Sequence, residues 1–328
     1  MKKNIAIVWG GYSSEKEVSE KSAVGIYSFI DKEKYNVYTV KIDHESWSAS
    51  YKNNTYPIDK NDFGFMADSE AIKFDFAYIT IHGTPGEDGT LQGYFDMLGI
   101  PYSNSGVLSS ALTFNKFVCN RYLKSFGIKV PESVLLKKNS VYNTDEIVAH
   151  LGLPVFVKPN AGGSSFGTTK VKDFLQLDKA VADAFDESSE VIVESFIAGT
   201  EVTCGCYKTG QGLQVLPLTE VVSHNEFFDY AAKYKGQVEE ITPARISKQM
   251  TKKIKETTSL IYDLVGAKGI IRADYIISAN TPVLLEINTT PGMTPTSFIP
   301  QQVAAANLSM TDVLSEIIEY EYSKVKSS

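Results

Sequence analysis

Residues 270–292 carry the side chains whose types and spacing best suit metal chemistry. Two apolar, β-branched runs flank a Ser-Ala-Asn-Thr-Pro turn, which predicts a β-hairpin. Arg272 and Asp274 interrupt the first run, and Glu286 and Asn288 interrupt the second. Because side chains alternate faces along a strand, a register that pairs Asp274 with Glu286 brings all four together. Oxygen donors of this kind suit Mg²⁺, which proteins hold through one or two carboxylates plus substrate phosphates.

The hairpin by itself leaves two interpretations open. Strands on the outside of a sheet often carry alternating charges into solvent, where they have no chemical role. The alternative is a floor for a metal–nucleotide complex. The tail at 289–293, Thr-Thr-Pro-Gly-Met, leads the second run into a loop, and loops are frequent carriers of function. This tail slightly favours the second interpretation.

A glycine-rich segment at 158–167, Lys-Pro-Asn-Ala-Gly-Gly-Ser-Ser-Phe-Gly, lies between two predicted strands. Small residues let backbone N–H groups approach phosphate oxygens, and Lys158 adds a cation near them. The segment is not a P-loop, because Thr168 stands where the lysine belongs. Without a Gly-x-Gly-x-x-Gly after the first strand, a dinucleotide fingerprint is also absent. A flexible hairpin tip and a phosphate-binding loop both fit the residues.

Two more segments have a functional and a plain interpretation. At 193–197, Val-Glu-Ser-Phe-Ile followed by Glu201 is either a domain linker or an adenosine site, with backbone groups at the adenine edge and a carboxylate at the ribose. At 228–234, Phe-Asp-Tyr-Ala-Ala-Lys-Tyr is either a helix edge with exposed tyrosines or a lid that excludes water.

Strands and a helix alternate in the first part of the chain. We expect strands at 4–9, 35–42 and 74–81, and a helix at 15–30. This alternation predicts a parallel sheet that binds ligands at the carboxyl ends of its strands. Glu15 and His82 both lie just past such ends, and the unit closes near residue 112.

Two further units follow. We expect the second to be α+β, with elements at 116–126, 133–136, 145–151, 154–158, 169–171, 175–185 and 191–194. We expect the third to contain strands at 203–207 and 213–220, a helix at 247–264, the hairpin described above and a C-terminal helix from Met310.

Length and composition restrict the class of protein. A chain of 328 residues suggests two or three domains. Its net charge of −7 argues against a nucleic-acid partner, and no apolar run approaches the roughly 18 residues of a membrane span. The apolar part of the N-terminus, about five residues, is too short for a secretory signal. Three cysteines, at 119, 204 and 206, cannot all pair, so we expect a reduced, cytoplasmic protein.

Four sequence blocks in order resemble the D-alanine–D-alanine ligases of the ATP-grasp superfamily, over essentially the whole chain. The blocks are Gly-Gly…Ser-Glu-Lys-Glu-Val-Ser at 10–19, His-Gly…Gly-Glu-Asp-Gly-Thr-Leu-Gln-Gly at 82–93, Lys-Pro…Gly-Ser-Ser…Gly at 158–167 and Glu-x-Asn-Thr-x-Pro-Gly-Met-Thr at 286–294. The resemblance implies an α/β (α+β), three-domain ATP-grasp architecture with a Rossmann-like parallel-sheet N-terminal domain. It implies domains at 1–112, 113–196 and 197–328.

The resemblance also implies an activity. A ligase of this kind joins two D-alanine molecules to D-alanyl-D-alanine through a D-alanyl phosphate intermediate, for peptidoglycan synthesis. It would use ATP with two Mg²⁺ or Mn²⁺ ions, act on small molecules without a nucleic acid or membrane partner, and form a homodimer.

Each matched residue carries an implied role. The metal ligands would be Asp274, Glu286 and Asn288. The ATP site would comprise Lys116, Lys158, Gly163, Ser164, Ser165, Glu194, Ser195, Phe196, Ile197, Glu201 and Lys233. The first D-alanine would meet Glu15 and His82, and the second would meet Ser297 and Phe298. The catalytic set would be Glu15, Ser164 and Tyr234, which close the lid, with Arg272 and the Gly292 N–H at the oxyanion and Ser297 at the second carboxylate.

Three positions refine this picture. Relatives that make D-alanyl-D-lactate have a histidine where this chain has Tyr234, so tyrosine indicates the dipeptide product. Ser195 stands where many relatives carry a lysine at the adenine site. Phe298 replaces the usual leucine beside the second substrate, which could narrow that subsite.

Other functions stay as alternatives. A depsipeptide or D-alanyl-D-serine ligase is the nearest of them. A non-catalytic nucleotide-binding regulator on the same fold would have no need of all four hairpin residues. A nicotinamide-dependent oxidoreductase would suit the apolar first strand and Gly-Gly, but the dinucleotide fingerprint is missing.

Overall fold

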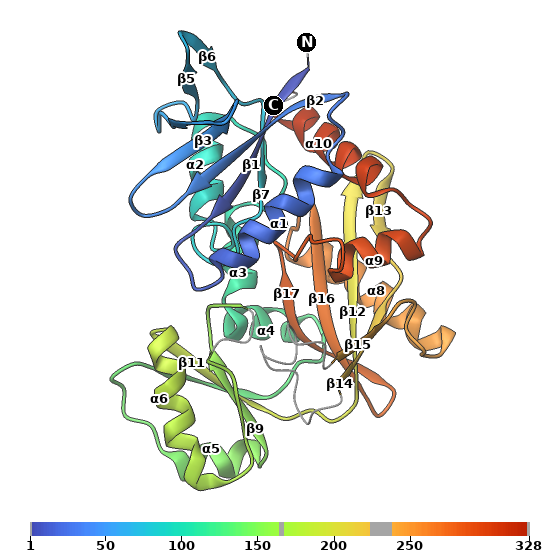
Figure 1. Cartoon of the computed structure of the whole chain (residues 1–328). Helices are drawn as coiled ribbons and strands as arrows, with labels where there is room; N and C mark the ends of the chain where they lie inside the picture. Colours follow the sequence, from blue (N-terminus) through green and yellow to red (C-terminus); the bar gives the residue numbers. More distant parts are fainter. Residues whose placement is uncertain (1, 164–166, 224–237, 327–328) are drawn as a thin grey trace.

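The computed structural model describes residues 2–163, 167–223 and 238–326. Three sheets of four or more strands and their helices make up this part of the chain (Figure 1). The first sheet has the order β4-β3-β2-β1-β7. Its strands are β1 (Lys3–Gly10), β2 (Tyr35–Ile42), β3 (Trp47–Tyr51), β4 (Asn54–Pro57) and β7 (Phe76–Ile79).

The predicted parallel sheet is confirmed for β1, β2 and β7. The middle residues of β1 are fully buried, as expected for a parallel strand covered on both faces. Strands β3 and β4 extend the sheet in antiparallel fashion, and β5 (Phe65–Ala67) and β6 (Glu70–Ile72) form a small separate hairpin. These short strands gave no clear period in the sequence and were not predicted. The helices of this unit are α1 (Lys16–Phe29), α2 (Thr90–Leu98) and α3 (Val107–Phe114).

The second sheet is antiparallel, with the order β10-β9-β11-β8. It occupies the yellow-green lobe at the lower left of Figure 1. Its strands are β8 (Ser133–Lys137), β9 (Val155–Pro159), β10 (Thr169–Val171) and β11 (Glu190–Ser195), and its helices are α5 (Thr144–Leu151), η1 (Phe174–Gln176) and α6 (Leu177–Glu187). Helix α6 buries Leu177, Val181 and Ala184 against the strands, at the spacing of one helix face.

The third sheet has the order β15-β14-β12-β16-β17, and β13 also pairs with β12. Its strands are β12 (Thr200–Thr209), β13 (Gly212–Val215), β14 (Thr219–Ser223), β15 (Val238–Ile241), β16 (Ile270–Ser278) and β17 (Thr281–Asn288). The prediction of one strand at 213–220 is wrong. The strand is interrupted between Val215 and Thr219, where Pro217 has no N–H to donate to a neighbouring strand.

Helices cover both faces of the third sheet. Helix α8 (Lys248–Leu264) packs on one face with α4 (Lys116–Ser125), and α9 (Phe298–Ala305) and α10 (Met310–Lys326) pack on the other. The second group also contacts Ile5 and Ile7 of β1, so one apolar core joins the first and third sheets. Cys119 and Leu123 of α4 lie in the core of the third sheet, although the predicted boundaries assign them to 113–196.

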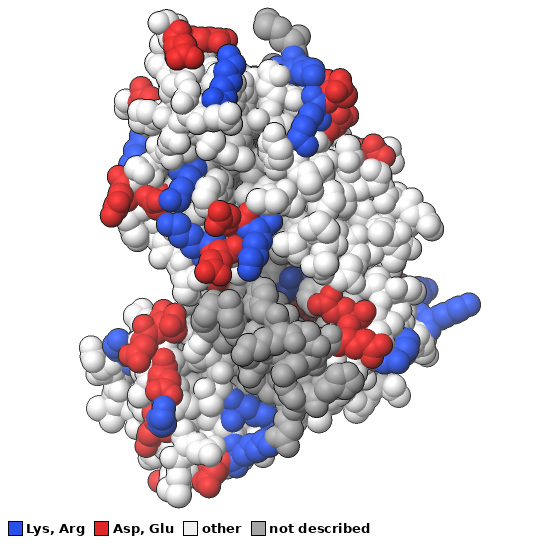
Figure 2. Space-filling view, viewed as in Figure 1, with Lys and Arg blue, Asp and Glu red and all other residues white. Residues whose placement is uncertain are grey.

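The cysteines are unpaired and the surface charges in Figure 2 are mixed, as the sequence predicts. Cys119, Cys204 and Cys206 are buried and free, and burial raises the pKa of Cys119 and of Cys204 to about 12. On the face in Figure 2, Lys and Arg lie among Asp and Glu instead of forming one basic field. Among the described residues, no helix has both the length and the apolar character needed to cross a bilayer.

Candidate active site

A cavity of about 900 Å³ is lined by residues of the second and third sheets, of helix α1 and of the loops that follow β1 and β7. Every predicted site residue that the structure describes borders it: Glu15, His82, Lys116, Lys158, Gly163, Glu194, Ser195, Phe196, Ile197, Glu201, Arg272, Asp274, Glu286, Asn288, Gly292, Ser297 and Phe298. Ser164, Ser165, Lys233 and Tyr234 lie outside the described residues. Segments separated by more than two hundred positions in sequence therefore meet around one space.

The β16–β17 hairpin forms one wall of this cavity with the predicted register. Asp274 pairs with Glu286, and Arg272 pairs with Asn288. The guanidinium of Arg272 donates from Nε and Nη2 to the two carboxylate oxygens of Asp274, at 2.8 and 2.7 Å. Asn288 Nδ2 also donates to Asp274, at 3.0 Å. Arg272, Asp274 and Asn288 thus form one hydrogen-bonded set at the cavity, and Glu286 lines the cavity beside them.

Arg272 is buried, and its acidic partner Asp274 is partly buried. Burial works against its charge, but the carboxylate of Asp274 outweighs this effect and holds the pKa of Arg272 above its ordinary value. The guanidinium carbon also lies 5.2 Å from the ring centre of Phe298. Arg272 is consequently a fixed, permanent cation at the cavity wall.

The donor chemistry of the hairpin fits a hard cation. Asp274, Glu286 and Asn288 offer two carboxylates and an amide oxygen on adjoining strands, the type of ligand that Mg²⁺ takes beside substrate phosphates. Among residues 2–163, 167–223 and 238–326, no cluster of three or more His, Cys, Asp or Glu is poised to hold a metal by itself. A cation here would therefore need further oxygens from a bound anion.

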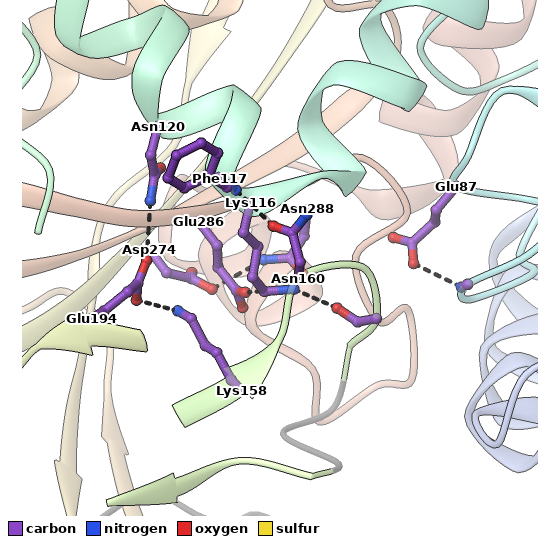
Figure 3. A network of polar contacts seen from close by, with 12 residues as sticks. Glu87, Lys116, Phe117, Asn120, Lys158, Asn160, Glu194, Asp274, Glu286 and Asn288 are labelled. Carbon is purple, nitrogen blue, oxygen red and sulfur yellow. Dashed lines mark hydrogen bonds and ion pairs between the residues drawn. The ribbon is translucent and has the colours of Figure 1, made fainter. Parts of the chain in front are cut away.

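Two lysines stand opposite the hairpin (Figure 3). Lys116 Nζ lies 3.7 Å from Glu286 and donates to the carbonyl of Gly162. Lys158 Nζ lies 2.6 Å from Glu194, which also accepts from Asn120 Nδ2 at 3.3 Å. Burial alone would lower the pKa of Lys158, but the carboxylates of Glu194 and Glu286 outweigh burial and raise it. Both lysines thus place positive charge at the cavity wall.

Asn160 fixes the start of the helix that carries Lys116. Its fully buried side chain accepts from the Phe117 N–H at 2.8 Å and donates to Asn115 and Glu190, at 3.0 and 2.8 Å. Sequence reasoning placed Asn160 in the glycine-rich segment but gave it no role. Its function depends on Asn115 and Glu190, which are remote in sequence and gave no local signal.

The predicted adenosine residues lie where the second and third sheets meet. Glu194 and Ser195 end β11, and Glu201 lies at the start of β12. The ring of Phe196 packs against Phe156, with 5.9 Å between centres, and Lys170 Nζ lies 3.8 Å from the Phe196 ring centre. These contacts give this end of the cavity an apolar and aromatic wall.

Glu15 lies at the opposite end, directly before α1. The glycine-rich segment reaches it, because a Cβ on Gly163 would stand 2.8 Å from both carboxylate oxygens. With any other residue at 163, the Glu15 carboxylate would have to move. His82 Nε2 lies 3.2 Å from Ser22 Oγ on α1, and Ser13 Oγ donates to the His82 carbonyl at 2.8 Å. Glu15 and His82 thus lie together around the start of α1.

Glu87 is a buried acid that sequence reasoning left without a role. It lines the cavity and accepts from the Gly83 N–H at 2.8 Å. Burial, reinforced by the charge of Glu15, raises the pKa of Glu87 to about 8. It was present in the second sequence block, but only the fold brings it within reach of Glu15.

The remaining predicted residues follow β17. Ser297 Oγ accepts from the Thr294 N–H at 3.0 Å, and Ser297 precedes α9 as its N-terminal flanking residue. A Cβ on Gly292 would lie 3.1 Å from Ser297 Oγ. Gly292, Ser297 and Phe298 therefore form a compact group beside Arg272.

The comparisons with known proteins agree with this site. The family model "D-ala D-ala ligase N-terminus" matches residues 4–105, and "D-ala D-ala ligase C-terminus" matches residues 122–319. The D-alanine–D-alanine ligase of Parabacteroides distasonis is 62% identical over 329 residues, covering 100% of both chains. That of Bacteroides fragilis is 59% identical, covering 98% of this chain and 100% of its own.

Solved structures agree as well. The VanG D-Ala:D-Ser ligase of Enterococcus faecalis is 34% identical with a TM-score of 0.87, covering 98% of this chain and 100% of its own. The D-alanyl-alanine synthetase A of Vibrio cholerae is 26% identical with a TM-score of 0.88, covering 98% and 99%. With both halves matched, the predicted ATP-grasp architecture confirmed and the motif residues gathered around one cavity, the chain belongs to the D-alanine–D-alanine ligase family.

Proposed function

We propose that this protein uses ATP to join two molecules of D-alanine to D-alanyl-D-alanine for peptidoglycan synthesis. One observation carries the proposal: the hairpin carboxylates, two partly buried lysines and Glu15 border the same cavity. This arrangement offers a phosphate-binding end and an ammonium-binding end within a single space.

The first step would be phosphoryl transfer. Glu15 binds the ammonium of the first D-alanine, so that its carboxylate faces the γ-phosphate. A carboxylate oxygen then forms a bond to phosphorus while the bond to the β-phosphate oxygen breaks, which yields D-alanyl phosphate and ADP. Lys116 and Lys158 stabilise the charge spread over the transferring group, so positioning and electrostatics supply most of the catalysis.

The metal ligands would act in the same step. Asp274, Glu286 and Asn288 are proposed to hold two Mg²⁺ or Mn²⁺ ions together with phosphate oxygens. When bound, such ions neutralise phosphate charge and orient the groups for in-line displacement.

The second step would form the peptide bond. The free amine of the second D-alanine attacks the acyl carbon, and phosphate leaves. Arg272 and the Gly292 N–H stabilise the negative charge on the carbonyl oxygen, while Ser297 binds the carboxylate of the incoming amino acid beside Phe298. The segment with Lys233 and Tyr234, together with Ser164, is proposed to close over the site and exclude water, which would otherwise hydrolyse the acyl phosphate.

Further parts of the proposal concern organisation. We propose that 1–112, 113–196 and 197–328 act as three units, that Ser165 and the backbone near Ile197 contact ATP, and that the protein is a cytoplasmic homodimer.

Mass spectrometry of the products from ATP, Mg²⁺ and D-alanine tests the function. We expect D-alanyl-D-alanine and ADP in equal amounts. Reactions with D-serine added in equal concentration test the alternative that the VanG D-Ala:D-Ser ligase illustrates, and reactions with D-lactate test a depsipeptide product. A predominant mixed product would replace the proposal with that alternative, and ADP formation without any condensed product would refute both.

A further inference from the structure

Strand β12 has a gap along one of its edges. On one side it pairs with β16 from Thr200 to Tyr207. On the other side it pairs with β14 as far as Thr203 and with β13 from Cys206 onward. Among the described residues, no strand pairs with Cys204 or Gly205 on this side. The carbonyl of Gly205 accepts from the Leu216 N–H at 2.9 Å, but the Gly205 N–H needs another partner.

The side chain of Gln302, on α9, fills this gap. Its Oε1 accepts from the Gly205 N–H at 2.9 Å, and its Nε2 donates to the Thr203 carbonyl at 3.1 Å. The same Nε2 donates to Thr219 Oγ1 on β14, at 3.1 Å. Gln302 is fully buried. Its carboxamide therefore takes the place of a peptide group of a neighbouring strand. It satisfies both the Gly205 N–H and the Thr203 carbonyl of β12.

Position 205 is occupied by glycine, and side chains of α9 lie directly over it. A Cβ at this position would stand 2.4 Å from Ile299 Cδ1 and 2.6 Å from Gln302 Oε1. A Cβ here would therefore displace the Ile299 methyl group and the Gln302 carboxamide from their present positions. The glycine thus leaves room for the Gln302 carboxamide, which ties α9 to β12.

The contact between Gln302 and β12 matters because predicted site residues lie next to both elements. Thr203 and Gly205 are the cross-strand partners of Asp274 and Arg272. At the other end of the contact, Gln302 lies one helical turn after Phe298, whose ring faces the Arg272 guanidinium at 5.2 Å. One buried amide thus joins the strand pair bearing Arg272 to the helix bearing the second-substrate residues.

We propose that Gln302 is a positioning residue for peptide-bond formation: it fixes the start of α9, with Ser297 and Phe298, against Arg272. This inference rests on the proposed function and extends it to a residue that touches neither substrate. Loss of the amide should weaken the second D-alanine subsite, which α9 builds, more than the first, which α1 builds.

The test is a comparison of the two D-alanine KM values in Gln302→Met, which keeps the length of the side chain and removes the amide. We expect the second-subsite KM to rise at least about tenfold, with the first-subsite KM and the ATP KM changed less than about twofold. Thr258→Val is the matched control, since Thr258 Oγ1 contacts Tyr275 Oη at 2.8 Å and both are buried on the opposite face of the same sheet. Thr258→Val should lower the thermal stability and should leave the ratio of the two D-alanine KM values unchanged.

A milder variant covers the case in which Gln302→Met does not fold. Thr219→Val removes one of the three Gln302 contacts, together with the contact between the Thr219 and Thr242 hydroxyls, and should raise the second-subsite KM by about threefold. Thr219→Ser keeps both contacts and should retain the wild-type value. Equal changes in both D-alanine KM values, or an unchanged second-subsite KM in a folded variant, would overturn the inference. If the wild-type protein makes no dipeptide, the proposed function itself fails, which is a different result.

Discussion

Lys158 Nζ lies 2.6 Å from a carboxylate oxygen of Glu194, and only 14% and 3% of the two side chains are exposed. The two residues lie on neighbouring strands, since β9 and β11 pair with Ile192 opposite Lys158. Replacement of one residue of such a pair is expected to lower the stability of the fold, because the other residue stays charged and desolvated.

Lys158→Met should therefore destabilise the fold by about 3–5 kcal/mol. Denaturant unfolding measures this loss. The double variant Lys158→Met with Glu194→Gln should recover much of the stability but not ATP binding, because no cation remains for the phosphates at this position. Equal stability of the single variant and the wild type would show that the pair is solvated in solution.

Glu286→Ala should lower kcat by roughly 10²–10³-fold or more, because it removes the carboxylate that stands opposite Asp274 at the phosphate end. A coupled ADP-release assay measures the effect, and titration with Mg²⁺ should show weaker metal activation. Glu256→Ala on the exposed surface of α8 is the control and should keep full activity. Undiminished ligation by Glu286→Ala would remove the proposed metal role.

The buried acid Glu87 predicts a pH dependence of stability. Its pKa is raised from 4.5 to about 8 in the folded protein, so the folded state holds a proton that the unfolded state releases. The contribution of protonated Glu87 to the free energy of unfolding is complete below pH 4.5. It is lost as the pH rises toward 8. Relative to Glu87→Gln, the wild type should lose up to about 1.4 kcal/mol per pH unit across that window.

Thermal unfolding of both proteins without ATP or metal, at about pH 5.5 and about pH 8.5, measures this difference. A constant gap between the two melting temperatures would mean that Glu87 is ionised in the fold throughout the range.

Tyr234→His should raise the ratio of D-alanyl-D-lactate to D-alanyl-D-alanine, because the expected role of this tyrosine is to favour an incoming amine over a hydroxy acid. Mass spectrometry of reactions that contain both acceptors gives the ratio. Tyr230→His, in the same segment, is the control. If both variants change the ratio equally, the effect belongs to the segment as a whole.

The sequence alone determined the local features of this protein. The alternation in residues 270–288 fixed the faces of the hairpin, and the structure has the predicted register of Asp274 with Glu286. The first parallel strands and most helices were predicted for the same reason, since hydrophobic period depends on neighbours a few positions away. The order of the four motif blocks was sufficient to indicate the ligase family.

The tertiary structure decided what depends on contacts between distant segments. Pro217 interrupts the segment 213–220 locally, but only the fold shows that the two resulting strands, β13 and β14, both pair with β12. The raised pKa of Glu87 requires burial beside Glu15, and the buried amide of Gln302 acquires its partners only when α9 packs on β12. A sequence pattern records which side chains share a face, but packing of the whole chain fixes which distant groups they meet, how deeply they are buried and what charge they carry.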